Sequence, residues 1–275
     1  ITHSRLPRHL PRHPAPHTLS HSFTLFLHTH TRPRPTFLPY PTVGPGETQG
    51  PNLLHFYIAK GPEMEDALAQ PPVPTGNVLY VMSETYLDGA QIGQHMEQGN
   101  TEKAEWFKQM LEFNAAYGKH MDIGSTSNFT GISDTQDFAQ KSIYQPGDAC
   151  IHMVWSVPAD KVAEMDAFWK EHEAWIRATH DMTRDGDGSE RPRMTSFNIR
   201  KGAEMENALA QPPVPTGNTL YIMSESYVAA SDIGKHMELG QTNMGEWFGK
   251  MMAHNATYGK HMDVGSTAVF THLDQ

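Results

Sequence analysis

One long internal repeat constrains the fold of this chain more than any other feature. Residues 56–130 recur at residues 197–271 with a constant offset of 141 residues, and roughly two thirds of the paired positions are identical. The longest shared runs are ALAQPPVPTGN, at Ala67–Asn77 and Ala208–Asn218, and YGKHMD, at Tyr117–Asp122 and Tyr258–Asp263. Because the period is as long as a domain, the repeat indicates a tandem duplication and not a solenoid of short units.

Charge and composition exclude several classes of function. The net charge is −10, and residues 1–46 hold five arginines and no acidic residue, so the rest of the chain carries −15. An acidic body disfavours binding to nucleic acid, whose phosphate backbone is held by Lys and Arg. No apolar run approaches the roughly 20 residues of a membrane span. Cys150 is the only cysteine, which excludes an intrachain disulfide and a cysteine-based zinc site.

Residues 1–50 differ from the rest of the chain because they are dense in His, Pro, Thr and Arg. Repeated proline opposes both helices and central strands, so we expect a low-complexity, disordered leader that lies outside the fold. Its composition is typical of an organelle transit peptide, or it is an artefact of how the chain was defined. We otherwise expect a soluble intracellular protein. One short patch, Ser22–Leu27, could pair as a strand.

Each copy of the repeat is predicted to contain two strands, a helical region and a closing strand. In the first copy (51–131), alternating hydrophobicity predicts strands at Leu53–Lys60 and Val78–Leu87, with a turn at Gly76-Asn77 between them. After Asp88, a candidate N-cap, apolar residues recur at helical spacing, and the predicted strand His120–Thr130 ends the copy.

The second domain (149–275) follows a polar linker (132–148) and has two more elements. Cys150–Val157 is predicted as a strand and Asp160–His180 as an amphipathic helix, and the second copy comes after them. The order is then βαββαβ, the ferredoxin-like plan. The first copy lacks an evident leading strand and helix. Either Ser22–Leu27 supplies the strand, or the domain is incomplete, or another chain completes it.

A short motif spans the junction between strand and helix in both copies. It reads E-x-Y-x-D-x-x-x-I-x-x-H from Glu84 to His95. The second copy repeats it from Glu225 to His236, with Ala229 in place of the aspartate. This motif resembles that of the antibiotic-biosynthesis-monooxygenase group of dimeric α/β-barrel proteins. The chain departs from the usual family pattern after each His, where a helical insertion (98–104 and 239–245) precedes the Trp-Phe pair.

The resemblance implies both a fold and a class of activity. The fold is α+β: tandem ferredoxin-like (βαββαβ) domains whose sheets pack into a dimeric α/β barrel within one chain, an intrachain pseudo-dimer that is free to oligomerise further. Known members include cofactor-free oxygenases of phenols or anthrones and heme-degrading oxygenases, and polyketide cyclases share the barrel. We therefore expect a small-molecule enzyme, a cofactor-independent monooxygenase of phenolic, quinol or polyketide-like substrates. The alternatives are a cyclase on the same barrel and a non-catalytic ligand-binding or assembly module.

The motif supplies the candidate catalytic residues. An imidazole titrates near neutrality, so His95 and His236 can take a proton from a phenol-like substrate. Glu84 and Glu225 can orient these imidazoles, or they can be hydrogen-bonded groups of an interface. His95 and His236 can likewise be interface residues without a catalytic role. The full catalytic set is Glu84, Tyr86, His95, Glu225, Tyr227 and His236.

The candidate substrate-binding residues are aromatic or imidazole side chains at matched positions in the two copies. Trp106 and Trp247 can stack on an aromatic ligand or belong to the core. The others are Tyr80 and Tyr221, on the strand face of the glutamates, and His120 and His261, on the closing strands. We predict no metal site and no cofactor. Heme, held by a helix histidine such as His172, is the alternative, although the helical spacing favours a packed His172.

Overall fold

The strands of the protein close into an antiparallel barrel. The computed structural model describes residues 21–29, 51, 53–69, 71, 73–101, 103–127, 145–186, 188–210 and 212–270. Within these residues the strand order around the barrel is β1-β3-β2-β8-β5-β7-β6-β4, and β4 pairs with β1 to close it. The strands are β1 (His21–Thr29), β2 (Leu53–Met64), β3 (Pro74–Tyr86), β4 (Gly118–Ser127), β5 (Ala149–Pro158), β6 (Met194–Met205), β7 (Pro215–Tyr227) and β8 (Gly259–Phe270).

The barrel consists of two sets of four consecutive strands, which we call the first half (β1–β4) and the second half (β5–β8). Within the halves, the strand orders β4-β1-β3-β2 and β8-β5-β7-β6 correspond strand for strand. The halves meet at two seams. At one seam β2 pairs with β8 through Ala59 and Ala268, and at the other β4 pairs with β6 through Thr126 and Lys201.

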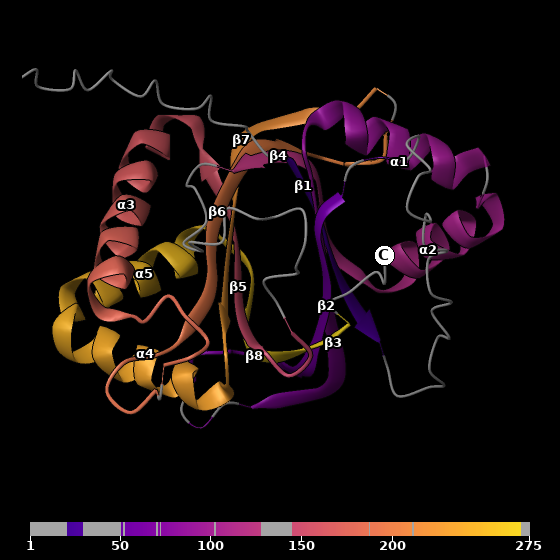
Figure 1. Ribbon diagram of the computed structural model, residues 1–275. Helices are drawn as coiled ribbons and strands as arrows, with labels where there is room; N and C mark the ends of the chain where they lie inside the picture. Colours follow the sequence, from indigo (N-terminus) through magenta and orange to yellow (C-terminus); the bar gives the residue numbers. More distant parts are fainter. Residues whose placement is uncertain are drawn as a thin grey trace, which may run out of the picture.

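Helices cover the outside of the barrel on two opposite sides (Figure 1). The second half carries α3 (Val162–Thr179), α4 (Ala230–Asn243) and α5 (Gly245–Tyr258), and the short η1 (Ala159–Lys161) leads into α3. The first half carries α1 (Gly89–Thr101) and α2 (Ala104–Tyr117). Asp88 caps α1 as predicted, because its carboxylate accepts a hydrogen bond from the backbone N–H of Gln91 (3.1 Å). None of the described helices combines the length and the apolar character that crossing a membrane requires.

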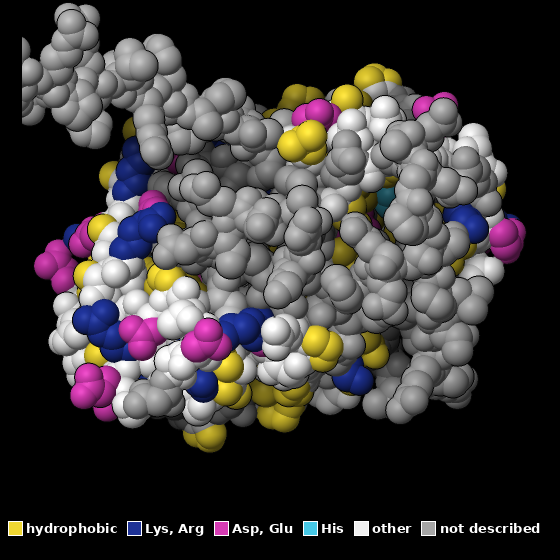
Figure 2. Space-filling model, in the orientation of Figure 1, with side chains coloured by type: hydrophobic (Ala, Val, Ile, Leu, Met, Phe, Trp, Pro, Cys, Tyr) yellow, Lys and Arg dark blue, Asp and Glu magenta, His cyan; other side chains and the backbone are white. Residues whose placement is uncertain are grey.

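The main hydrophobic core of the second half lies between its sheet and its helices. It brings together Trp155 of β5, Phe168 and Trp169 of α3, and Trp247 of α5. The rings of Phe168 and Trp247 stack with their centroids 4.4 Å apart. Such rings bury large apolar areas and fix the helices against the sheet. On the face seen in Figure 2, basic and acidic side chains are interspersed over the described helices of the second half.

The interior of the barrel is partly polar, and both halves contribute to it. A small apolar cluster joins Leu79 and Val81 of β3 to Val154, Leu220 and Ile222 of the second half. Two polar contacts also cross between the halves. The hydroxyl of Tyr57 lies 2.6 Å from Nε2 of His152, and the guanidinium of Arg200 donates a hydrogen bond to the hydroxyl of Ser83 (3.2 Å).

A glycine lets the backbones approach closely at each seam. A Cβ built on Gly61 of β2 would lie 3.0 Å from the Cα of Ser266 in β8. One built on Gly202 of β6 would lie 3.2 Å from the Cα of Ser125 in β4. The two contacts are equivalent by the repeat, since each pair of positions differs by the offset of 141 residues.

One local prediction from the sequence was wrong. The predicted turn at Gly76-Asn77 lies inside β3, which begins at Pro74, and Gly76 adopts a φ of 87° within the strand. Glycine adopts this conformation without steric cost, so it allows an irregular pairing with β2 that other residues would resist. The patch Ser22–Leu27, named as a possible strand, lies within β1, which pairs with β3 and β4. The rest of residues 1–50, the linker 132–144 and the helix position of the first half between β1 and β2 lie outside the described residues.

Candidate functional site in the second half

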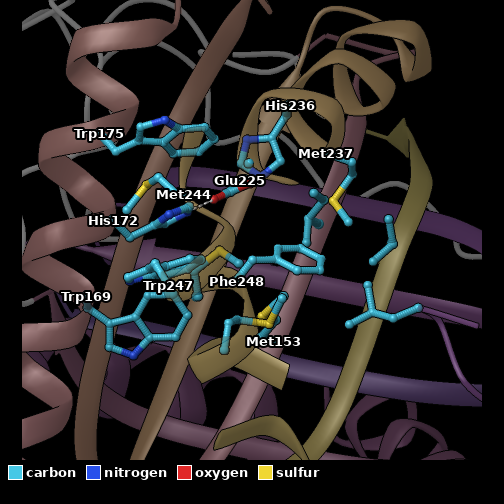
Figure 3. A pocket seen from close by; sticks show the side chains of 16 residues that line it. Met153, Trp169, His172, Trp175, Glu225, His236, Met237, Met244, Trp247 and Phe248 are labelled. Atoms are coloured by element: carbon cyan, nitrogen blue, oxygen red, sulfur yellow. Dashed lines mark hydrogen bonds and ion pairs between the residues drawn. The ribbon is translucent and has the colours of Figure 1, made fainter. Parts of the chain in front are cut away.

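A small pocket lies between the sheet of the second half and its helices (Figure 3). Its floor is formed by strand residues, including Met223 and Glu225 of β7, and its walls by the helices. Its volume is about 30 Å³, which is room for little more than a water molecule. The lining residues are Leu68, Ile151, Met153, Trp169, His172, Trp175, Met223, Glu225, His236, Met237, Gly240, Met244, Trp247, Phe248, Met251 and Val264.

Glu225 is the central polar group of this pocket. Its side chain is fully buried, and both of its oxygens have partners. Nε2 of His172 lies 2.9 Å from Oε1, and the hydroxyl of Tyr227 donates to Oε2 at 2.6 Å. Burial alone would raise the pKa of this carboxyl, but His236 and the hydrogen bonds from His172 and Tyr227 hold it down to about 2. Glu225 is therefore ionised at neutral pH inside a mostly apolar pocket.

His236 extends from α4 toward Glu225, and its Nε2 lies 3.7 Å from Oε2 of the carboxylate. Burial lowers the pKa of His236 to about 4, although Glu225 acts in the opposite direction. The imidazole is therefore neutral at pH 7. In Figure 3 the His236 ring lies on one side of Glu225 and His172 lies on the other.

A chain of hydrogen bonds behind His236 fixes which nitrogen carries its proton. The hydroxyl of Thr179 donates to the backbone oxygen of Trp175 (2.8 Å), so it accepts from Nδ1 of His180 (2.9 Å). Burial, followed by the proximity of His236, lowers the pKa of His180 to about 3, so Nε2 of this neutral ring is an acceptor. Nε2 of His180 lies 2.9 Å from Nδ1 of His236, which must donate.

This chain leaves the lone pair of His236 on Nε2, the nitrogen that faces Glu225. A lone pair and an ionised carboxylate oxygen then stand 3.7 Å apart without a proton between them. Two acceptors in this arrangement favour the entry of a group that brings a proton or a positive charge. The same arrangement would stabilise an imidazolium formed at His236, because the negative charge of the carboxylate lies 3.7 Å from its Nε2.

The same three residues could also hold a metal ion. One ligand atom from each of His172, Glu225 and His236 lies within 4.8 Å of the others, and this is the one such group within the described residues. Two imidazoles and one carboxylate form the ligand set of non-heme iron oxygenases and of several zinc enzymes. The hydrogen bond from Nδ1 of His236 to His180 is also the kind of outer contact that orients a metal-binding imidazole.

The first half contains the corresponding motif residues in a more open setting. The hydroxyl of Tyr86 donates to Glu84 (2.7 Å), and Nε2 of His95 lies 3.5 Å from the same carboxylate oxygen. The His95 side chain is 16% exposed, compared with 10% for His236. A groove of about 990 Å³ lies nearby, between α1, α2 and the loop of residues 206–214. Neither Glu84 nor His95 is among the described residues that line it.

The structure thus brings together each predicted glutamate, tyrosine and histidine of the motif, once in each half. It separates the predicted substrate-binding residues. Trp247 lines the pocket and stacks on His172, with ring centroids 4.3 Å apart. Trp106 and Tyr80 are half-buried and are not among the residues that line either cavity. The hydroxyl of Tyr221 donates to Asp166 (2.7 Å) and does not reach the pocket.

His120 and His261 lie on the other face of the sheet, inside the barrel. His261 is paired in register with Val154, a residue of the interior cluster. His120 and His261 therefore lie on the opposite side of the strands from this pocket. Inside the barrel, Asp263 instead pairs with His152 at 3.2 Å.

Sequence reasoning assigns no role in this pocket to two of its residues. The sequence favours a packed His172, with heme ligation as the alternative, and it places His180 only as a histidine outside the repeat. The available signal was the position of His172 in the apolar stripe of its helix, between Trp169 and Trp175. An ionisable group in such a stripe needs a polar partner when it is buried. Nothing in the sequence indicated that this partner was Glu225, which is 53 residues away.

No protein-family model matches this chain, and no curated protein matches its sequence. Among solved structures, the chain is similar to a protein of Fusobacterium nucleatum subsp. nucleatum named "putative monooxygenase", with a TM-score of 0.47, 8% identity and coverage of 93% of this chain and 95% of that chain. It is also similar to an anthrone oxidase-like protein, with a TM-score of 0.45, 8% identity and coverage of 92% of both chains.

Proposed function

We propose that the pocket of the second half is the active site of a small-molecule enzyme of the monooxygenase-like class. Its substrate is a phenolic, quinol or polyketide-like aromatic compound, and the reaction needs no bound cofactor. The observation that carries this proposal is the free Nε2 lone pair of neutral His236 beside the ionised Glu225. A phenolic hydroxyl placed between them can give its proton to His236, and Glu225 stabilises the imidazolium that results.

The walls of the pocket suit a flat aromatic substrate. Trp169, Trp175 and Trp247 can contact its faces, and the lining has few polar groups apart from Glu225 and the two histidines. Five methionines also line the pocket: Met153, Met223, Met237, Met244 and Met251. Methionine side chains are unbranched and adaptable, so they can rearrange to enlarge a cavity of about 30 Å³ when a ligand enters.

Deprotonation prepares such a substrate for reaction with dioxygen. The phenolate or enolate that forms is electron-rich and can pass an electron to dioxygen, which is the step that the family resemblance suggests. With an anthrone-type substrate, one oxygen atom becomes the new carbonyl oxygen. The other leaves as water together with the two hydrogens of the ring methylene, so the substrate supplies all the electrons and no external reductant is needed.

We further infer that the barrel consists of two ferredoxin-like units that were joined by duplication. The support is the matching strand order of the halves and the element order β5-α3-β6-β7-α4-α5-β8 of the second half, in which α4 and α5 together stand for one helix of the plan. In the first half, the elements from β2 to β4 correspond in order to those from β6 to β8. The polar contacts that cross between the halves inside the barrel are the intrachain counterpart of a dimer interface.

The test is oxygen consumption with a panel of anthrones, quinols and simple phenols. We expect His236→Ala to lower turnover by about 100-fold or more, as loss of a general base does. Glu225→Gln should also lower turnover, because it removes the charge that stabilises the imidazolium. The matched variants His95→Ala and Glu84→Gln in the first half should retain wild-type turnover. Full activity in His236→Ala would overturn the assigned base. Aromatic ligands that bind with no turnover on any of these substrates would favour a non-catalytic binding module.

A second candidate function, metal-dependent oxygenase chemistry, is favoured by the cluster of His172, Glu225 and His236. In that case His236 would be a ligand and could not accept a proton. The two candidates therefore predict opposite results when metal ions are removed, and that experiment decides between them.

A further inference from the structure

The two halves exchange a loop, so that each half contributes to the cavity of the other. The loop of residues 65–73 joins β2 to β3 in the first half, yet its Leu68 lines the pocket of the second half. The loop of residues 206–214 joins β6 to β7 in the second half. Its residues Ala208, Leu209, Ala210, Pro212 and Pro213 line the groove of the first half. We call these the 65–73 loop and the 206–214 loop.

The described residues around each leucine are held by matching hydrogen bonds. In the 65–73 loop, the Asp66 carboxylate accepts a hydrogen bond from the backbone N–H of Leu68 (2.9 Å), and Glu65 N–H donates to the carbonyl of Val73 (2.9 Å). In the 206–214 loop, Asn207 replaces the aspartate and accepts from Leu209 N–H at the same distance. Asp and Asn side chains stabilise turns through this type of bond.

The base of each loop is held by a glutamate that joins its two strands. Glu63 of β2 accepts hydrogen bonds from Thr75 (2.7 Å) and Asn77 (3.0 Å) of β3. Glu204 of β6 accepts the equivalent bonds from Thr216 (2.8 Å) and Asn218 (3.2 Å) of β7. These bonds leave each loop little freedom at its ends, so the position of the leucine is set by the fold of its own half.

Leu68 therefore helps to determine the shape of a pocket whose other described lining residues belong to the second half. Among the described residues that line this pocket, Leu68 alone comes from the first half. It also packs against the hydrophobic core of the second half and is half-buried there. A branched apolar side chain at this point occupies volume that a larger aromatic ring system would need.

We propose that Leu68 of the first half is a specificity-determining residue for the active site in the second half. It limits the size of the aromatic substrate that fits beside Glu225 and His236. This inference rests on the proposed function of that pocket. Leu209, its counterpart, borders the groove of the first half and has no part in selecting the substrate.

The test uses two phenols whose ionised forms absorb visible light, 4-nitrophenol and the larger 4-nitro-1-naphthol. Their affinities for the full chain are measured by titration calorimetry, and the phenolate band shows whether the bound phenol has lost its proton. Leu68→Ala should bind 4-nitro-1-naphthol at least 10-fold more tightly than wild type, with a change of less than about 3-fold for 4-nitrophenol. Leu68→Trp should weaken the binding of both by 10-fold or more. Loss of one or two methylene-sized contacts in such a pocket commonly changes selectivity by this amount.

Leu209→Ala and Leu209→Trp are the matched controls, and both should leave the two affinities unchanged. Circular dichroism and thermal unfolding show that each variant is folded, and Leu68→Val provides a milder truncation if Leu68→Ala unfolds the chain. Equal affinities in wild type, Leu68→Ala and Leu68→Val would overturn the role of Leu68. A size effect of Leu68 without any phenolate band would support this inference and contradict the proton transfer to His236, so the two proposals fail separately.

Discussion

His180 holds His236 through a hydrogen bond between two ring nitrogens, Nε2 of the first and Nδ1 of the second, 2.9 Å apart. His180 follows α3 directly and His236 lies in α4, so the contact joins two helices that are far apart in sequence. Both rings are nearly buried, with exposures of 3% and 8%. The bond decides which nitrogen of His236 is free, and the proton transfer proposed here depends on that choice.

Replacing His180 should therefore reduce activity without altering substrate contacts. In His180→Phe, Nδ1 of His236 loses its acceptor and the ring can turn or exchange its proton between nitrogens. We expect turnover to fall by about 10- to 100-fold with KM nearly unchanged, and the free energy of unfolding to fall by about 1–3 kcal/mol. Steady-state kinetics and urea unfolding measure the two effects.

His180→Gln provides the rescue, because its amide oxygen can accept the same hydrogen bond. Turnover in His180→Gln should recover at least partly relative to His180→Phe. If both variants lose the same activity, the contact is structural and does not position His236.

Stability should decrease as the pH falls below about 6.5, because four histidines are held neutral in the folded chain. Burial is the largest cause in each case, and it lowers the pKa of His120, His236 and His261 to about 4 and that of His180 to about 3. The unfolded chain then binds more protons than the folded chain between about pH 6.5 and pH 3. The stability present above pH 6.5 is lost progressively as the pH falls across this range.

Urea unfolding at pH 7.5 and pH 5.0 measures this loss. His261→Gln removes one of the four groups from inside the barrel and should make the difference between the two pH values smaller than in wild type. An unchanged difference would show that His261 is protonated in the folded chain or does not titrate in this range.

Removal of metal ions separates the two candidate functions. Under the proposed function, prolonged dialysis against a strong chelator should leave oxygen consumption within about 2-fold of the untreated protein, since His236 acts as a base. Under the second candidate, activity should be lost and then restored by adding Fe(II) or another divalent ion. His95→Ala, which leaves the cluster of His172, Glu225 and His236 intact, should respond to the chelator as wild type does.

The seams between the halves should not tolerate a side chain at their two glycines. Gly61→Ala places a methyl group about 3.0 Å from the backbone of Ser266, and Gly202→Ala places one about 3.2 Å from that of Ser125. We expect each to lower the free energy of unfolding by about 1–3 kcal/mol. Gly93→Ala in α1 meets nothing within 4 Å, and it should stabilise the chain by about 0.5–1 kcal/mol. Equal effects at all three glycines would contradict the close packing of the seams.

Much of the architecture follows from the repeat, because each copy carries the alternation and helical spacing of its own elements. The strands from Leu53, Cys150 and Met194 and the helix of residues 160–180 were predicted close to their observed positions. The boundary at Pro74 was missed because proline and glycine indicate a turn, whereas here they lie in an irregular part of β3. The strand at Ser22–Leu27 is only one of several alternatives in the sequence, because its surroundings are rich in proline and local composition carries no information about its partners β3 and β4.

The site was only partly predictable, for a related reason. The motif places Glu225, Tyr227 and His236 within 12 consecutive residues, so local spacing is enough to bring them together. His172 and His180 reach the same point from another helix, and Leu68 reaches it from the other half of the chain. Such contacts depend on how the elements pack, which the sequence does not state directly. For His120 and His261, strand alternation fixes the two faces of each closing strand without showing which face meets the helices, so their role in substrate binding stays a prediction.

The covalent joining of the halves has an evolutionary consequence. In a symmetric dimer of identical subunits, any substitution appears twice, at both copies of an interface and in both cavities. Here a change at Leu68 and a change at Leu209 are independent events, as Asp88 and Ala229 already illustrate. One cavity can therefore acquire new chemistry while the other half preserves the scaffold. In a homodimer the two cavities cannot diverge in this way, because both subunits have the same sequence.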